Sequence, residues 1–239
     1  MQAKFVDYLK DPEVSILSHF FNGLMLKYQI RPHDWECIEA FLAPLRTKGE
    51  PYLMTFEHSV RVALLGTKVA EFMHVDPKVM VFAGLLHDIG KIQVPAETLG
   101  KTDNWTQKDT ELMKPHVMRS YEIVRDRFDF SGEVILWHHR FQAHAYPRGL
   151  PKPTHNFCAG TKVMIPFYGR LLSLCDQFDA FHRVNGKNGV AQIPTGEGIK
   201  ELMLKFNGDQ RLLIEGLYAA DIFTTFTAPL QELDVQTSS

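Results

Sequence analysis

The chain has 239 residues, with 26 Lys and Arg against 28 Asp and Glu, which gives a formal net charge of −2. This length suits one globular domain with a small extension, and 45% hydrophobic against 23% charged residues excludes a disordered chain. The balanced charge excludes a general affinity for nucleic-acid polymers or anionic membranes, so any affinity for phosphate has to come from a local site.

The sequence also bears on location. No apolar run approaches the roughly 18 residues that span a bilayer, and residues 1–9 hold Lys4 and Asp7 without an apolar stretch, so we expect neither a membrane segment nor a secretory signal. The three cysteines, Cys37, Cys158 and Cys175, are odd in number and far apart. A reducing cytoplasm is therefore the expected location, without a disulfide framework.

Apolar residues recur at intervals of three and four along most of the chain, and alternating strand patterns are close to absent, so we expect an all-α fold. The predicted helices cover residues 33–42, 55–73, 78–89, 107–128, 131–139, 167–181, 198–206 and 209–226. Thr55 is expected to cap the helix that it begins. Residues 78–89 are apolar nearly all round, which predicts a buried helix with Gly90 as its stop signal.

Two stretches rich in Pro and Gly are expected to interrupt the helices. Residues 44–51 are predicted to separate an N-terminal helical extension, residues 1–50, from the main domain, residues 51–230. Residues 143–164 hold three prolines and two glycines and cannot form one regular element. A polar tail over residues 231–239 ends the chain.

The histidines concentrate on the most apolar predicted helices. His87 and Asp88 close the buried helix over 78–89, and His138 and His139 close another apolar segment. His58 lies on the amphipathic helix over 55–73, His116 follows a helical Leu-Met pair, and Asp176 lies inside an otherwise apolar run. Polar groups on buried helices are costly unless they have partners. One such residue alone is more often a hydrogen-bonded core residue, but the whole set is satisfied most economically around metal ions.

The order of these residues resembles the HD superfamily of metal-dependent phosphohydrolases. His58, the segment 85–91 with its His87–Asp88 pair, and the distant Asp176 carry this resemblance. It extends to the HD-GYP branch, whose known members hydrolyse cyclic di-GMP. The matching landmarks, over about residues 55–225, are 58–62, 87–95, 99–101, 105–106, 113–116, 137–139, 146–150, 165–170 and 176–180.

The resemblance implies an HD-domain helical bundle with a dinuclear metal centre. One ion would be held by His58, His87, Asp88 and Asp176, and the second by His116, His138 and His139, with Asp88 bridging the two. A carboxylate bridge and neutral imidazoles suit two divalent ions such as Fe, Mn, Ni, Co or Zn, and do not distinguish among them. Such a pair can share a hydroxide that attacks a phosphodiester.

The expected catalytic residues are Asp88 and Lys91, and the candidate substrate contacts are Lys91, Arg61, Tyr146, Arg183 and Lys187. Lys91 is placed to contact a phosphate oxygen or to protonate the leaving group; the alternative is a solvated lysine at a helix end. Arg61 is expected either to orient a ligand or to be exposed. Asp179, one turn after Asp176, is expected to orient rather than to bind metal. Arg183 and Lys187 are expected either to bind phosphate or to decorate a loop.

The chain departs from the branch in three places. The signature HHExxDGxGYP is replaced by HHRFQAHAYP over residues 138–147, with Arg140 in place of the acidic residue and Ala145 in place of the name-giving glycine. In the family this segment shapes the substrate mouth and a partner surface. Met54 stands where some relatives place a Glu that holds a third ion, which favours two ions here, with Glu57 nearby.

The third departure is an additional segment over residues 151–162, which is either a lid or a surface insertion. His144 precedes this segment and His155 lies within it. Neither is expected to be a metal ligand, although either could contact the substrate.

The leading interpretation is therefore a metal-dependent phosphodiesterase that hydrolyses a cyclic dinucleotide such as cyclic di-GMP by attack of metal-bound hydroxide on phosphorus. Two alternatives stay open. One is an HD phosphohydrolase for another nucleotide or a cyclic mononucleotide, and the other is a non-catalytic module that binds a nucleotide or a partner protein. A second copy of the chain or a signalling protein is a further possible partner.

Overall fold

The structure is a computed structural model, and it describes residues 23–153, 155–182 and 194–224. Every regular element in these residues is a helix, which confirms the all-α fold. In chain order they are α3 (Pro32–Thr47), α4 (Tyr52–Phe72), α5 (Pro77–Leu86), η1 (Ile89–Gln93), α6 (Ala96–Leu99), α7 (Gln107–Met113), α8 (His116–Val124), α9 (Asp129–Ile135), α10 (Ala159–Phe181), α11 (Gly196–Phe206), η3 (Gly208–Gln210) and α12 (Arg211–Ala219). None of the helices described is long and apolar enough to cross a bilayer.

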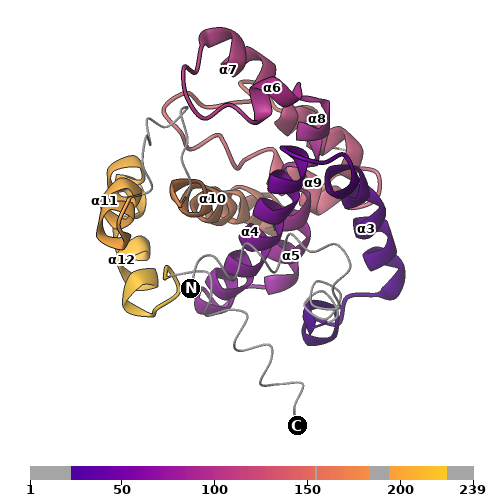
Figure 1. The fold of residues 1–239 in the computed structure, drawn as a ribbon. Coiled ribbons are helices and arrows are strands. Elements are labelled where there is room, and N and C mark those ends of the chain that lie inside the picture. The colour runs from indigo at the N-terminus through magenta and orange to yellow at the C-terminus, as the bar shows by residue number, and fades with distance from the viewer. Residues whose placement is uncertain (1–22, 154, 183–193, 225–239) are drawn as a thin grey trace.

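Helices α4, α5 and α10 form the centre of the bundle (Figure 1). Helix α4 packs on α3, α5 and α10, while α11 and α12 lie beside α10 on one flank. Side chains from these helices, including Val60, Leu86 and Leu172, are fully buried in one continuous core. The residues at positions 58, 87–88 and 176 therefore come from elements that meet in the middle of the molecule.

Glycine allows two of these elements to approach closely. A Cβ atom on Gly84 of α5 would lie 2.5 Å from the Cα of Ala63 in α4. A Cβ on Gly90 would lie 2.2 Å from the carbonyl oxygen of His116, and the Gly90 N–H donates to Ser120 Oγ at 2.9 Å. Gly90 does not end the preceding helix as expected, because α5 stops at Leu86 and Gly90 lies inside η1. Its role is to let η1 contact α8.

Two predicted boundaries near the N-terminal side are wrong. Helix α3 continues through Pro44 to Thr47, because its last turn is anchored in the core by the fully buried Leu45. Helix α4 begins at Tyr52, so Thr55 is a buried residue within the helix and not its cap. Tyr52 is buried and its hydroxyl donates to the carbonyl of Val94 at 2.9 Å, which extends the helix toward its N-terminus.

The predicted helix over 107–128 is two helices, α7 and α8. Pro115 separates them, because it has no N–H with which to continue the hydrogen-bond ladder. Helix α7 begins with a capping box between Thr106 and Asp109. The next helix, α9, begins at Asp129, two residues before the expected start, and ends at Ile135 instead of residue 139, so His138 and His139 follow the helix in a turn.

Two more boundaries differ on the C-terminal side. Helix α10 begins at Ala159, eight residues before the expected start, so the irregular stretch ends at Cys158 and Pro166 lies within the helix. Helix α12 ends at Ala219, where the left-handed conformation of Asp221 (φ 54°) stops it before residue 226.

The domain division into residues 1–50, 51–230 and 231–239 stays a prediction. Residues 1–22 and 225–239, which include the polar tail, lie outside the described residues. Within the described part, Trp35 and Ile38 of α3 are buried in the same core as α4 and α5.

Candidate metal centre

All seven predicted ligands lie together in the interior of the bundle. Six of their side chains form two groups of three. Within each group, one nitrogen or oxygen atom of each side chain lies within 4.8 Å of those of the other two. The first group is His58, His87 and Asp88, and the second is His116, His138 and His139. Asp176 joins the first group, since its Oδ1 lies 3.1 Å from Nε2 of His58. The assignment of these residues to two ions stays a prediction.

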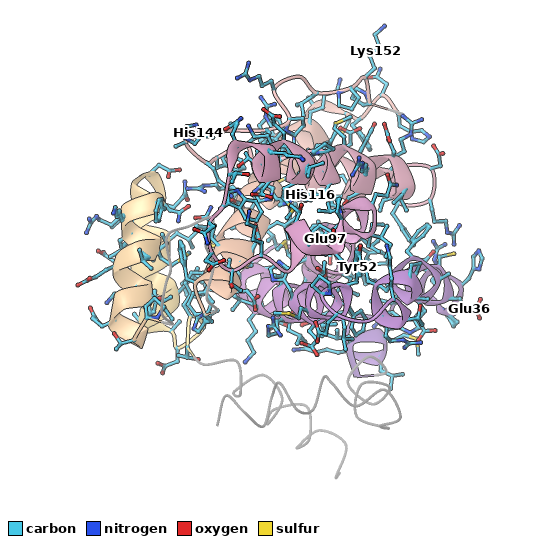
Figure 2. All side chains as sticks on the ribbon, turned by 45° about the horizontal axis from the view of Figure 1, so that its top comes forward. Glu36, Tyr52, Glu97, His116, His144 and Lys152 are labelled. Carbon is cyan, nitrogen blue, oxygen red and sulfur yellow. The ribbon has the colours of Figure 1, made fainter. Side chains whose placement is uncertain are left out.

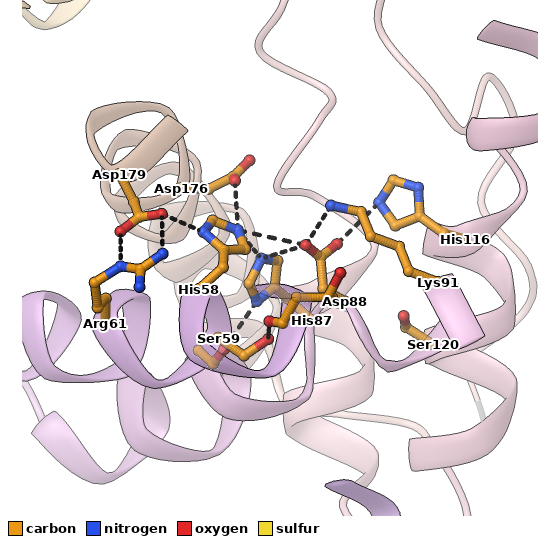
Figure 3. A network of polar contacts seen from close by, with 12 residues as sticks. His58, Ser59, Arg61, His87, Asp88, Lys91, His116, Ser120, Asp176 and Asp179 are labelled. Atoms are coloured by element: carbon orange, nitrogen blue, oxygen red, sulfur yellow. Dashed lines mark hydrogen bonds and ion pairs between the residues drawn. The ribbon is translucent and has the colours of Figure 1, made fainter. Parts of the chain in front are cut away.

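Asp88 lies between the two groups (Figure 3). Its Oδ2 is 3.4 Å from Nε2 of His58 and 3.3 Å from Nε2 of His87. Its other oxygen, Oδ1, is 3.2 Å from Nε2 of His116. One carboxylate therefore presents a different oxygen to each group, which is the arrangement that a bridging ligand requires.

Three of the imidazoles are oriented by a main-chain carbonyl at or near the end of a helix. In each, Nδ1 lies within hydrogen-bonding distance of the carbonyl three residues earlier: 2.8 Å for His87 and Gly84, 2.7 Å for His116 and Met113, and 2.6 Å for His138 and Ile135. A carbonyl only accepts, so Nδ1 must carry the proton. In the neutral form of each imidazole Nε2 is therefore unprotonated, with its lone pair toward the neighbouring candidate ligands, which is the form that binds a metal.

His58 is oriented by a carboxylate instead. Its Nδ1 lies 2.6 Å from Oδ2 of Asp179, and Arg61 donates to Asp179 from Nε at 2.6 Å and from Nη2 at 3.3 Å. Burial opposes ionisation of Asp179, but the charges of Arg61 and His58 outweigh it and hold the Asp179 pKa far below its ordinary value. Arg61 is largely buried behind the ligands, so the exposed alternative does not hold, and this position does not make it a direct substrate contact.

The buried polar atoms of the two groups fit a metal ion better than they fit one another. Asp88 Oδ1, His116 Nε2 and His138 Nε2 are buried without a hydrogen-bond partner. Although 3.2 Å separates Asp88 Oδ1 from His116 Nε2, two acceptor lone pairs meet there, and no hydrogen bond forms. A divalent cation would satisfy all three atoms at once.

The protonation states agree with this fit. Burial lowers the pKa of His138 to about 3 and also lowers the pKa of His116, so both imidazoles are neutral near pH 7. Burial opposes the ionisation of Asp88, but the charges of His87 and Lys91 hold its pKa well below the ordinary value. For Asp176 the hydrogen bond from His58 and the charge of His139 outweigh burial in the same way. The neutral imidazoles of His116 and His138 and the ionised carboxylates of Asp88 and Asp176 are the forms in which these residues bind a metal.

Lys91 lies at the edge of the centre, on η1. Its Nζ donates to Asp88 Oδ2 at 2.5 Å, and its side chain is 14% exposed. The solvated alternative therefore does not hold, and the ammonium group faces the ligands from the side that solvent can reach.

Tyr146 forms a wall of the second group. Its ring is buried, stacks on His139 with centroids 4.5 Å apart, and meets His116 edge-on at 6.0 Å. Arg140, which replaces the acidic residue of the signature, donates from Nη1 to the carbonyl of Pro147 at 2.5 Å and contacts the carbonyl of Arg148 at 3.3 Å. Arg140 thus links the beginning of the altered signature to the main chain at its end.

Other residues near the centre take different roles. The Gln142 amide lies 2.7 Å from Nδ1 of His139, a contact that the three-residue spacing could have suggested and that sequence reasoning missed. Met54 is exposed and Glu57 is buried. His155 pairs with Asp129 at 3.0 Å and is not among the ligands. Among the remaining predicted substrate contacts, Arg183 and Lys187 lie outside the described residues.

The comparison with protein families agrees with this geometry. The HD domain family model matches residues 55–180, which is more than half of the chain. The chain belongs to the HD domain family. The seven candidate ligands all lie within the matched residues, and the resemblance to the HD superfamily expected from the sequence is confirmed.

Three curated relatives are cyclic dinucleotide phosphodiesterases by name. The cyclic di-GMP phosphodiesterase of Thermotoga maritima is 32% identical over 53% of this chain and 34% of its own length. The cyclic di-GMP phosphodiesterase PA4108 of Pseudomonas aeruginosa is 32% identical over 58% of this chain and 32% of its length. The 3'3'-cGAMP-specific phosphodiesterase 1 of Vibrio cholerae is 28% identical over 56% and 30%. The match thus covers about a third of each relative, and these relatives support the HD-GYP branch.

Proposed function

We propose that this chain is a metal-dependent phosphodiesterase that hydrolyses a cyclic dinucleotide such as cyclic di-GMP. The observation that carries the proposal is the convergence of seven ligand-type side chains in two buried groups joined by the two oxygens of Asp88. The names of the relatives favour a cyclic dinucleotide over other phosphodiesters.

Two divalent ions are the proposed cofactor, with Fe, Mn, Ni, Co or Zn compatible with the ligand types. His58, His87, Asp88 and Asp176 would hold one ion, and His116, His138 and His139 the other, with Asp88 shared. When bound, such a pair supplies Lewis acidity toward phosphoryl oxygens and hydroxide at neutral pH.

The remaining work falls to residues of the chain. Lys91 holds a positive charge at the accessible edge of the centre, where its Nζ can donate a hydrogen bond to a phosphate oxygen or a proton to the departing ribose oxygen. Tyr146 covers one face of His139 and so limits the space in which the substrate and water can lie. Asp179 and Arg61 hold His58 in the orientation that points Nε2 inward.

A panel assay tests the proposal. The protein, loaded with Mn or Fe, is incubated with cyclic di-GMP, 3'3'-cGAMP and a cyclic mononucleotide, and the products are separated by chromatography and weighed by mass spectrometry. We expect cleavage of a cyclic dinucleotide to a linear dinucleotide or to mononucleotides, loss of cleavage with a chelator, and loss of both ions in the His87→Ala/Asp88→Ala double variant.

Two other results would replace the proposal. Turnover of the cyclic mononucleotide alone would identify an HD phosphohydrolase for another nucleotide. Full metal occupancy with a bound nucleotide and no turnover would identify a non-catalytic module. The cytoplasmic location and a homodimer or signalling partner stay predictions, which cell fractionation and the measured mass in solution would test.

A further inference from the structure

A small open hollow lies on the surface beside the second group of ligands. It is lined by Lys114, Ala143, His144, Ala145 and Arg148. The lining therefore holds two permanent cations and one imidazole, and no acidic side chain. Within the described part of the chain, neither Lys114 nor Arg148 has a carboxylate partner. Such a hollow suits an anion.

Two residues that line the hollow are near residues of the candidate metal centre in the sequence. Lys114 precedes the ligand His116 by two residues, and Ala145 adjoins Tyr146, whose ring meets His116 edge-on. Figure 2 shows His144 at the outer edge of the molecule and His116 toward its middle. The hollow therefore lies next to Tyr146 in the chain, and the Tyr146 ring contacts both His116 and His139.

The lining is held in place by its neighbours. Arg140 contacts the carbonyls of Pro147 and Arg148, and its guanidinium lies over the Trp137 ring at 5.1 Å. The N–H of Tyr146 also donates to the carbonyl of His139 at 3.4 Å. The main chain at Arg148 is therefore hydrogen-bonded to the segment that carries His139, and such ordering before a substrate binds reduces the entropy cost of binding.

A cyclic dinucleotide carries two phosphodiester groups, and only one of them reacts at a time. Its ring contains two phosphodiesters, and while one lies at the metal centre the other keeps its negative charge at the far side of the ring. We propose, on the basis of the proposed function, that this hollow binds the second phosphodiester of a cyclic dinucleotide, through Lys114 and Arg148. These residues would be specificity determinants, because a substrate with one phosphodiester cannot use them.

The test compares substrates with two phosphodiesters and one. The Lys114→Gln/Arg148→Gln double variant removes both charges and keeps much of each side chain. With metal-loaded protein we expect its KM for cyclic di-GMP to rise at least about tenfold, since each charge-assisted hydrogen bond contributes that much. Its kcat/KM for bis(4-nitrophenyl) phosphate, which has one phosphodiester, should stay within about twofold.

A second variant adds charge without removing any contact. Ala145 is exposed in the hollow, so Ala145→Glu places a carboxylate there without disturbing the core. It should raise the KM for cyclic di-GMP at least as much as the double variant. The matched control is Lys205→Gln/Arg211→Gln, which removes one Lys and one Arg from exposed positions on α11 and α12 and should leave both substrates unaffected.

The outcomes separate the hollow from the proposed function. An unchanged KM for cyclic di-GMP in both variants, or an equal loss on both substrates, would overturn the phosphate subsite. A rise for cyclic di-GMP but not for 3'3'-cGAMP would also overturn it, in favour of base recognition, because the two rings share their phosphodiesters. A wild-type protein that cleaves neither cyclic dinucleotide would refute the proposed function itself and the subsite with it.

Discussion

Asp179 stands behind His58, with its Oδ2 2.6 Å from Nδ1 of the imidazole whose Nε2 faces Asp176. Asp179 is buried and held by Arg61. It touches none of the other ligands in the contacts described above, and so acts on the metal centre through the orientation and basicity of His58.

We expect Asp179→Asn to weaken metal binding by about 10–100-fold, because partners behind metal-binding histidines contribute that much. Competition with a chromogenic chelator measures the affinity. The control is Asp209→Asn, which removes another carboxylate that pairs with an arginine, Arg170, far along the chain. Unchanged metal affinity in a folded Asp179→Asn protein would contradict the role of Asp179.

Substitutions in the two groups of candidate ligands should lower the metal content of the protein to different extents. His138→Ala should reduce the metal content from about two ions per chain to about one, because His138 belongs to the second group only. Asp88→Ala should lose both ions, since its oxygens face both groups. Elemental analysis of purified protein measures this, with the exposed His155→Ala as the histidine control. Equal losses in the His138 and Asp88 variants would argue against two separate groups.

Gly90→Ala should destabilise the protein, since its Cβ would lie 2.2 Å and 2.7 Å from main-chain atoms of His116 and Ser120. Main-chain atoms cannot swing aside, so we expect a loss of at least about 1–3 kcal/mol in the free energy of unfolding. Urea denaturation measures it. Gly160→Ala is the control, because nothing lies within 4 Å of its added Cβ and it begins a helix; that variant should be neutral or slightly more stable.

The acid side of the stability profile should depend on Asp109. Hydrogen bonds from Lys101 and Thr106 lower the Asp109 pKa from 3.8 to about 2. A lowered pKa in the folded state means that the carboxylate stabilises the fold above about pH 3.8 and loses this effect as the pH falls toward 2. The difference in unfolding free energy between wild type and Asp109→Asn should therefore be constant from pH 7 to 5 and shrink below pH 4. A difference independent of pH would contradict this role.

The clustering of the seven candidate ligands was predictable partly from their chemistry and partly from the resemblance to the HD superfamily, which implied the assignment to two ions. A His–Asp pair and a His–His pair at the ends of apolar segments have few stable environments other than a metal site, and Asp176 in an apolar run points the same way. The contacts behind the ligands were only partly predictable. The sequence shows that Asp179 lies one helical turn after Asp176. Nothing in it pairs Asp179 with Arg61, because the two residues lie 118 positions apart and only the packing of α4 on α10 brings them together.

The helix boundaries were predicted less well, for physical reasons that involve particular residues. Pro44 and Pro166 looked like breaks, yet α3 and α10 continue through them because neighbours such as Leu45 and Ile165 are buried. Pro115 looked like part of a helix, yet it separates α7 from α8. Local propensity is the same in all three cases, and tertiary burial decides which proline interrupts a helix.

Main-chain anchoring of His87, His116 and His138 has an evolutionary consequence. Their Nδ1 atoms bond to carbonyls three residues earlier, and no substitution of a neighbouring side chain can delete a carbonyl. Substitutions in the loop from Arg140 to Tyr146, which borders the candidate centre, therefore leave the orientation of these three imidazoles unchanged. Changes in that loop can therefore occur without first disturbing the orientation of these three candidate ligands.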